Sequence, residues 1–302
     1  MLSTIQNWSI SRPNALPRFT VPLFGGLGNQ LFGLAFAAYL TLSQPNAVQT
    51  MLMRQSKGNE THGQNVQTAF NADVEIFQVT EKFSDLVTLT YLRFARSKGC
   101  IAPRLGNYFY LNSSGELEIL ANKPLHGKSI FVSNYFRTKQ YLDWLQERSK
   151  FLQLTPTLTS SRFGYFSTMV QSKDVFVVHV RRGDYMRPSI GEALPPSFFL
   201  RALSSLGASK KSPLVLLSDS PDLVKREFTE LGFDNIVNNP DAKNHLTAAE
   251  SLAIASKSHN FVMSNSTFSW WAARTGNLQK RVAFPSGWNT ELMSPNWTSI
   301  TT

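Results

Sequence analysis

The stretch VFVVHVRRGDYMRP, residues 175–188, joins an almost wholly apolar run to two arginines, a glycine and an aspartate. A short apolar run rich in valine predicts a strand buried on both faces, as in a parallel sheet. Charge placed directly after such a strand lies at the carboxyl edge of the sheet, where open α/β folds bind their ligands. The stretch therefore predicts both a sheet and an anion site at its edge.

Apolar runs and amphipathic helical patterns alternate through the rest of the C-terminal half. The runs predict strands at 175–180, 213–220, 235–237, 260–264 and 281–284. The patterns between them predict helices at 196–206, 221–232, 247–258 and 267–276. Each crossover helix must return the chain to start the next parallel strand, so this order predicts a Rossmann-like domain with helices on both faces.

The N-terminal half begins in a similar way. Residues 19–23 predict a strand, the turn GGLGNQ (25–30) follows, and the apolar stretch 31–42 predicts a buried helix. A further apolar run at 128–136 leads into a helical pattern at 139–151, and the polar stretch 55–71 predicts an exposed loop. We therefore expect an extension over 1–18, one domain over 19–155 and a second over 156–302.

Composition limits the class of partner and the compartment. Thirty Lys and Arg against twenty Asp and Glu give a net charge of +10, which favours an anionic partner such as nucleic acid, an acidic membrane surface or a phosphorylated small molecule. The basic residues form no long run, which disfavours nucleic acid. Cys100 is the only cysteine, so no intrachain disulfide or thiolate metal cluster forms. Without a signal peptide or an apolar stretch near 20 residues, the sequence predicts a soluble, cytoplasmic protein.

Arg181 and Arg182 are the first candidates for an anion site. A guanidinium offers a planar fork of donors that matches phosphate oxygens, and Gly183 lets the backbone turn or approach a ligand. A solvated loop in which Arg182 pairs with Asp184 is an equally good interpretation of this spacing. His179, inside the apolar run, is more often a satisfied core histidine than a ligand.

The stretch SNSTFSWWAARTG, residues 264–276, supplies a second candidate site. Asn265, Ser266 and Thr267 fall at a strand-to-helix junction, where backbone N–H groups and hydroxyls bind anions with the helix dipole behind them. The same residue types are routine helix N-caps, and both roles are compatible. The tryptophans at 270 and 271 are expected to pack in the core.

Two weaker signals complete the set of candidates. The glycines of GGLGNQ depart from the dinucleotide fingerprint, and no acidic residue follows at the distance that would hold a ribose, so a nicotinamide oxidoreductase is disfavoured. Ser218 and Asp219 end a predicted strand and could accept hydrogen bonds from a ribose or base, although a turn and a helix cap explain them as well.

Taken together, four stretches resemble the glycosyltransferase family that contains the α1,2-fucosyltransferases: GGLGNQLF (25–32), HVRRGDY (179–185), LSDS (217–220) and SNSTFSWWAA (264–273). The resemblance extends from about residue 20 to about residue 285. It implies an α/β fold of the GT-B type, in which two Rossmann-like domains face each other across a cleft. It further implies that the C-terminal domain binds GDP-fucose and that the N-terminal domain contributes to acceptor binding.

The resemblance also implies roles for individual residues. Arg182 would hold the β-phosphate of GDP, with Arg181 and His179 forming or supporting the pocket. The remaining donor-binding residues that it implies are Asn265, Ser266 and Thr267 at the phosphates, Asp219 on the guanosine side, and Gly26, Gly28 and Asn29 approaching from the N-terminal domain.

The reaction implied by the resemblance is an inverting transfer of L-fucose from GDP-β-L-fucose to the 2-hydroxyl of a terminal galactose. Neither a metal ion nor a cofactor is expected, because arginines and a helix end replace the ion; consistently, no D-x-D pair occurs. Asp184 is the candidate general base, or else it orients an arginine. Membrane association, and a Golgi location, are expected only if an anchor is missing from this chain or a partner supplies one.

Several differences from the family pattern put acceptor specificity in doubt. The chain reads GLA at 33–35 where the family usually has QYA, and AARTG follows the two tryptophans. The alternatives are a GT-B enzyme with another GDP-sugar or acceptor linkage, a member that binds the donor without transfer, and, more remotely, a basic nucleic-acid-binding protein.

Overall fold

The computed structural model divides the chain into two compact units, which are described separately here. The first comprises residues 1–67 and 72–151, and the second comprises 152–302 together with 68–71. Within them the structure describes residues 18–23, 25–43, 49–54, 78–80, 104–105, 108–111, 129–132, 142–143, 145, 156, 159–186, 192–237 and 246–302. The predicted loop at 55–71 and most of the helical pattern at 139–151 lie outside the described residues.

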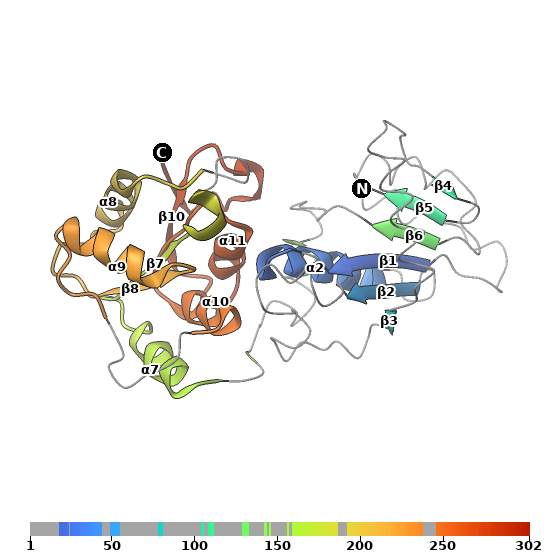
Figure 1. Ribbon diagram of the computed structural model, residues 1–302, viewed down its shortest axis with the longest axis horizontal. Coiled ribbons are helices and arrows are strands. Elements are labelled where there is room, and N and C mark those ends of the chain that lie inside the picture. The colour runs from blue at the N-terminus through green and yellow to red at the C-terminus, as the bar shows by residue number, and fades with distance from the viewer. Residues whose placement is uncertain are drawn as a thin grey trace. The chain divides into compact units, whose positions relative to one another are not determined.

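The N-terminal unit is built on a mostly parallel sheet (Figure 1). Its strands follow the order β3-β2-β1-β6-β5-β4. The bounds are β1 Arg18–Leu23, β2 Gln49–Arg54, β3 Gln78–Thr80, β4 Arg104–Leu105, β5 Tyr108–Leu111 and β6 Ser129–Val132. Only the β4–β5 pair is antiparallel among these described strands. This topology is that of a Rossmann-like unit with one antiparallel edge strand.

Helix α2, Leu27–Ser43, follows β1 and packs against β1 and β2. Its sequence is apolar on nearly every side, and residues such as Leu31, Phe32 and Phe36 are buried. A helix that is hydrophobic all round is a helix enclosed by the protein. The buried helix predicted from residues 31–42 is therefore confirmed, with its start one turn earlier than expected.

The C-terminal unit contains a five-stranded, wholly parallel sheet with the order β11-β10-β9-β7-β8. The bounds are β7 Phe176–Val180, β8 Leu214–Ser218, β9 Asn260–Val262, β10 Arg281–Pro285 and β11 Thr298–Ile300. Beyond β8, a single parallel bridge joins Leu214 to Ile236. If that bridge counts as the third strand, the order is the 3-2-1-4-5-6 of a doubly wound fold.

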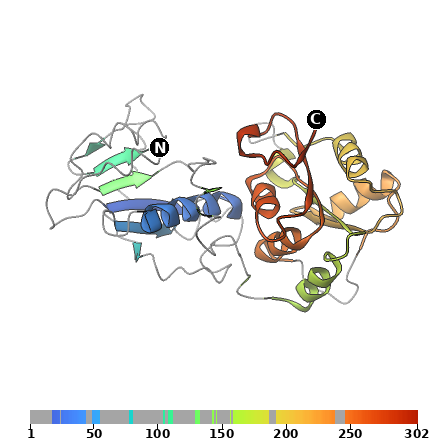
Figure 2. The ribbon, with the colours of Figure 1, turned by 180° about the vertical axis from the view of Figure 1, so that it is seen from behind.

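Helices cover both faces of this sheet (Figures 1 and 2). The bounds are α7 Ser161–Met169, α8 Pro196–Ser205, α9 Pro221–Glu230, α10 Ala248–Lys257 and α11 Thr267–Arg274, with short 3-10 turns η3 Gly183–Met186 and η4 Thr290–Leu292. A core between α8, α9 and the sheet contains Phe198, Phe199, Phe228 and Val178. On the other face α10 packs against α11 and α7.

Glu250 joins two of these helices at their N-termini. Its side chain completes a capping box with Thr247 at the start of α10. The same carboxylate accepts hydrogen bonds from the backbone N–H and the hydroxyl of Ser160, the N-cap of α7, at 2.7 and 2.6 Å. One buried carboxylate therefore fixes where both helices begin.

Most of the predicted elements of this unit are confirmed, and the exceptions have physical causes. The strand predicted at 235–237 is only the bridge at Ile236, because it lies at the sheet edge with a single partner. Strand β11 and helix α7 were not predicted from the sequence, because β11 is only three residues long and the apolar residues of α7 stand among polar residues in a segment of nine. Neither gives a clear period in the sequence.

Candidate functional site

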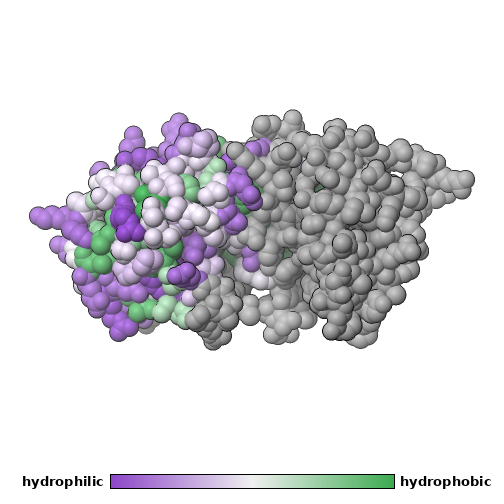
Figure 3. Space-filling view, turned by 90° about the horizontal axis from the view of Figure 1, so that it is seen from above, coloured by the Kyte–Doolittle hydropathy of each residue, from purple (hydrophilic) through white to green (hydrophobic). Residues whose placement is uncertain are grey.

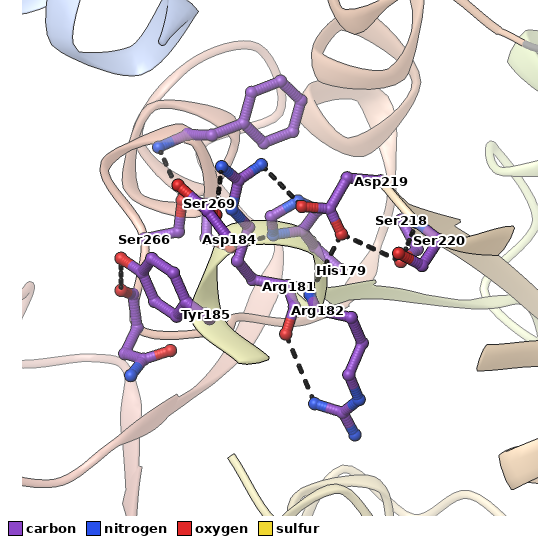
Figure 4. A network of polar contacts seen from close by, with 12 residues as sticks. His179, Arg181, Arg182, Asp184, Tyr185, Ser218, Asp219, Ser220, Ser266 and Ser269 are labelled. Carbon is purple, nitrogen blue, oxygen red and sulfur yellow. Dashed lines mark hydrogen bonds and ion pairs between the residues drawn. The ribbon is translucent and has the colours of Figure 1, made fainter. Parts of the chain in front are cut away.

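The candidate site lies at the carboxyl ends of β7, β8 and β9 (Figure 4). Arg181 and η3 follow β7, Asp219 follows β8, and Ser264–Ser266 join β9 to α11. From β7 the chain passes to β8 on one side of β7, and then returns to form β9 on the other side of β7. This is the point at which the strand order reverses, and ligands of open α/β sheets bind there.

Arg181 is held between two carboxylates. Its guanidinium lies 2.6 Å from Asp184 Oδ1 and 2.8 Å from Asp219 Oδ2. The side chain is 20% exposed and its guanidinium carbon is 5.6 Å from the centre of the Tyr185 ring. The pairing of Arg182 with Asp184 that the spacing allowed is wrong, because Arg181 is the partner of Asp184.

Arg182 points away from this cluster, as Figure 4 shows. Its guanidinium forms a forked ion pair with Glu227 of α9, with Nη2 to Oε2 at 2.8 Å and Nε to Oε1 at 3.1 Å. Nη1 also donates to the carbonyl of Leu194, and the side chain is only 3% exposed. Because Arg182 is buried and turned toward α9 while Arg181 remains partly exposed at the cluster, this geometry favours Arg181 over Arg182 for a phosphate contact.

Asp219 contacts both arginines. Oδ2 forms the ion pair with Arg181, and Oδ1 accepts the backbone N–H of Arg182 at 2.9 Å. Gly183 makes this approach possible, because a Cβ there would lie 2.5 Å from Asp219 Oδ2. The guanosine contact predicted for Asp219 stays a prediction, and the contacts observed are those that fix the arginine loop.

His179 is a buried residue beneath the site, as its place in the apolar run indicated. Its Nδ1 lies 2.5 Å from the hydroxyl of Ser269, and the ring packs against Phe268. The Ser269 hydroxyl also accepts the backbone N–H of Ser264 at 3.1 Å. Burial, with a smaller effect from Arg181, lowers the pKa of His179 to about 3, so the imidazole is neutral at physiological pH.

The β9–α11 junction combines a helix cap with unsatisfied polar atoms. Ser266 is the N-cap of α11 and its hydroxyl accepts the N–H of Phe268, so the capping interpretation is confirmed. Thr267 is the first residue of α11. The Ser264 hydroxyl and Asn265 Oδ1 are buried and have no hydrogen-bond partner in the described part of the chain. Such groups are costly unless a ligand or water meets them.

Two further contacts fasten that junction to its surroundings. The Tyr185 hydroxyl donates to the carbonyl of Asn265 at 3.1 Å, and Asn265 Nδ2 donates to the carbonyl of Glu192 at 2.9 Å. The loop after β7 and the loop after β9 therefore form one connected rim. Trp270 and Trp271 are buried behind it, as expected of core residues.

Gly26, Gly28 and Asn29 belong to the N-terminal unit, at the carboxyl end of β1 and the first turn of α2. The carbonyl of Gly26 accepts the N–H groups of Asn29 and Gln30, and Gly25 has a φ of 74°, a conformation that favours glycine. These residues form the β1–α2 turn in a Rossmann-like unit. Their part in donor binding stays a prediction.

Two residues that organise this site, Glu227 and Ser269, were not among the candidates predicted from the sequence. In α9, Glu227 stands next to Phe228 and three residues after Val224, and both of these residues are buried. An acidic residue so close to the buried side of a helix was the one feature of the sequence that could have indicated a buried partner for Glu227. Nothing in the sequence distinguishes Ser269 from the other serines of 264–269. Both act on neighbours that are far away in the sequence, and only the fold makes those pairs.

Among the described residues, no three His, Cys, Asp or Glu side chains cluster in a way that could hold a metal ion. The carboxylates nearest the site, Asp184 and Asp219, are both engaged by Arg181. Two guanidiniums face three carboxylates in this region, so the group has one net negative charge. The backbone N–H groups at the start of α11 are therefore needed to make the rim attractive to an anion.

Comparison with known proteins relates the chain to glycosyltransferases. Residues 159–300 match the model of glycosyl transferase family 11. The O-antigen biosynthesis glycosyltransferase WbnK of Escherichia coli is 22% identical over 288 residues, covering 88% of this chain and 93% of that protein. No helix in the described residues has the length and apolar character needed to span a membrane.

The fold is similar to that of Arabidopsis thaliana FUT1, a mutant of which was solved in complex with GDP. The TM-score is 0.51 at 12% identity, over 93% of this chain and 73% of that one. Two Rossmann-like units in this chain confirm the expected α/β fold of the GT-B type. The part of the chain that carries the site, residues 159–300, is similar in sequence to glycosyl transferase family 11.

Proposed function

We propose that this protein transfers L-fucose from GDP-β-L-fucose to the 2-hydroxyl of a terminal galactose, with inversion and without a metal ion. The observation that carries the proposal is the place of Arg181. It stands at the switch point of the sheet, where it is held by Asp184 and Asp219. The GDP complex of FUT1, which shares the fold, supports a guanine nucleotide as donor.

Arg181 takes the role that the family resemblance implied for Arg182. A guanidinium carries five N–H donors, so one fork can contact its carboxylates and a phosphate oxygen at the same time. Arg182 supports it through the backbone, because the N–H of Arg182 donates to Asp219, the carboxylate that also pairs with Arg181. Removal of one preorganised donor to a developing oxyanion typically costs about 3 kcal/mol of transition-state stabilisation.

The β9–α11 junction would complete the phosphate site. The start of α11 presents backbone N–H groups and the positive end of a helix dipole. The buried hydroxyl of Ser264 has no partner among the described residues and can donate to a phosphate oxygen, which would relieve a desolvation cost. Asn265 Oδ1 only accepts hydrogen bonds, so its partner would be a hydroxyl or N–H group of the ligand and not a phosphate oxygen. His179 acts through Ser269 to hold the backbone of this junction in place.

In the reaction, the acceptor hydroxyl attacks the anomeric carbon from the face opposite the diphosphate. The bond from that carbon to the β-phosphate oxygen breaks, and its electron pair leaves with GDP. Arg181 offsets the charge that develops on the leaving oxygen. The hydroxyl proton passes to a base or to water; Asp184 is paired at 2.6 Å with Arg181, so we assign it to orienting that arginine.

Two measurements test this function. Thermal unfolding with GDP, GDP-fucose and UDP-sugars should show stabilisation by the guanine nucleotides only, about 2.7 kcal/mol at a hundredfold excess over Kd. Incubation with GDP-fucose and lactose, N-acetyllactosamine or a type 1 disaccharide should give a 2-linked fucoside, with and without EDTA.

Other outcomes would select other functions. Stabilisation by GDP-fucose without turnover would leave a donor-binding member of the family, and transfer from a different GDP-sugar would correct the donor. Loss of turnover in EDTA would overturn metal independence. Salt-sensitive retention on DNA or RNA with no response to GDP would favour a nucleic-acid-binding protein.

A further inference from the structure

The amino-terminal edge of the C-terminal sheet, opposite the candidate donor site, carries a regular set of basic residues. In the strand register, one row crosses the sheet through Leu214, Phe176, Asn260 and Arg281. Three residues before the first three members of this row stand Lys211, Lys173 and Lys257. With Lys210 and Arg281, these residues form what we call the basic edge.

The basic edge keeps its charge. All five side chains are exposed, and none lies within ion-pair distance of a carboxylate among the described residues. Their contacts are with neutral groups: Lys210 donates to the carbonyl of Leu231, and Lys257 donates to the hydroxyl of Ser167. Neutral acceptors orient the ammonium groups without reducing the positive charge that they present.

The strand ends that carry the basic edge are fastened together. The side chain of Asn260 donates to the carbonyls of Lys173 and Val175, and its Oδ1 accepts two hydrogen bonds from Arg281. Neighbouring strands lie about 4.8 Å apart, so four strand ends place these cations along a rim of about 15 Å. The acids that the same chain segments bring to this rim, Asp174, Glu230 and Asp234, are fewer than the five cations.

Leu278 adds an apolar group to this rim. It lies in the α11–β10 loop, three residues before Arg281, and is 67% exposed. An exposed leucine beside cations fits the boundary between lipid headgroups and acyl chains, where it can be buried while the cations meet phosphates. A single-stranded nucleic acid would call for exposed aromatic stacking platforms, whereas the rings that contact the basic edge, Phe163 and Phe233, are buried.

We infer that the basic edge docks on the surface of a membrane containing anionic phospholipids, with Leu278 inserted at the headgroup boundary. Strand β7 has five residues and spans about 16 Å, so docking at this edge holds Arg181 about that far from the lipid. The inference does not rest on the proposed transfer reaction, since it concerns the opposite edge of the sheet.

Sedimentation with lipid vesicles tests the inference on the full chain. Vesicles of equimolar phosphatidylcholine and phosphatidylglycerol should bind the protein, vesicles of phosphatidylcholine alone should not, and added salt should release it. The double variant Lys173→Gln/Lys211→Gln should bind about 30-fold more weakly, because each lost cation is worth about one kcal/mol at such a surface. Leu278→Ser should weaken binding further.

The matched control is Lys225→Gln/Arg226→Gln, which removes the same charge from the exposed side of α9. It should leave vesicle binding within about twofold of the parent protein. An equal loss in both double variants would show attraction by net charge alone and would overturn the inference. So would binding to duplex DNA or heparin in the absence of any binding to anionic vesicles.

Folding and donor binding are measured on every variant. Unchanged thermal unfolding and unchanged stabilisation by GDP would show that the edge variants act on membrane binding alone. Failure of GDP binding in the parent protein would contradict the proposed function without affecting the vesicle result, so the two proposals can fail independently.

Discussion

Arg182 and Glu227 form a forked ion pair that joins the loop after β7 to helix α9, 45 residues later in the chain. Arg182 is 3% exposed and Glu227 22%, so the guanidinium depends on this partner for its charge compensation. The ring of Phe199 covers the guanidinium at 5.7 Å. This pair fixes the path of the chain immediately beside Arg181, and the two adjacent arginines consequently have different tasks.

Arg181→Ala should strongly reduce transfer without unfolding the protein. We expect turnover to fall about 10²–10³-fold, the usual effect of removing one donor to a developing oxyanion. Arg181→Lys keeps the charge but loses the planar fork, and it should recover only part of the activity. Initial rates with GDP-fucose and thermal unfolding measure the two effects; near-normal turnover of the alanine variant would contradict our assignment.

Arg182→Ala should instead destabilise the fold. Removing one member of a buried pair typically costs about 3–5 kcal/mol, because the other charge loses its partner. Replacing both residues, with Arg182→Met and Glu227→Leu, should recover much of that stability. Chemical denaturation of the two singles and the double gives the coupling energy, and additive single effects would refute the importance of the pair.

Gly183→Ala should reduce donor binding through Asp219. The new Cβ would lie 2.5 Å from Asp219 Oδ2, so the carboxylate that holds Arg181 must move. Gly164→Ala is a suitable control, because it lies in helix α7 and, apart from adjacent residues and the helix backbone, a Cβ there would meet no atom within 4 Å. The control should be stabilised by up to about 1 kcal/mol, with GDP binding unchanged. Equal GDP affinity in both variants would contradict this role of Gly183.

Glu250 should make the fold sensitive to acid. Burial raises its pKa, but the hydrogen bonds from Ser160 and Thr247 outweigh burial and leave the pKa below its ordinary value. A carboxyl whose pKa is lower in the folded state stabilises the protein above its unfolded pKa, about 4.3, and loses that contribution as pH falls. Glu250→Gln should therefore be less stable at neutral pH and lose less stability between pH 5 and 3.

Lys280 should make stability rise in alkaline solution. Its ammonium is buried and donates to the carbonyls of Ala272 and Thr275 at the end of α11; burial lowers its pKa to about 7. An unfolded lysine titrates near 10.4, so from about pH 7 to about pH 10 the unfolded chain binds more protons and stability rises with pH. Lys280→Met should flatten that rise, whereas Lys225→Met on exposed α9 should keep it.

The sequence by itself determined the architecture of the C-terminal unit and the edge at which its site lies. Residues 175–180 are apolar enough to require a buried strand, and helices between such strands require a parallel sheet. Polar residues after those strands must then meet at one edge, so Arg181, Asp219 and Ser266 could be grouped without coordinates. Local sequence patterns suffice to predict these strands and helices, because the spacing of apolar residues along the chain reflects which face of each element is buried.

Only the tertiary structure decided what each of those residues does. Arg181 and Arg182 are adjacent and chemically identical, yet one meets Asp219 and the other Glu227, and both carboxylates come from later segments of the chain. Side chains that follow a strand can turn to either side of the sheet edge. Which side they take depends on long-range charge pairing and burial, and these are properties of the packed fold that no local pattern contains.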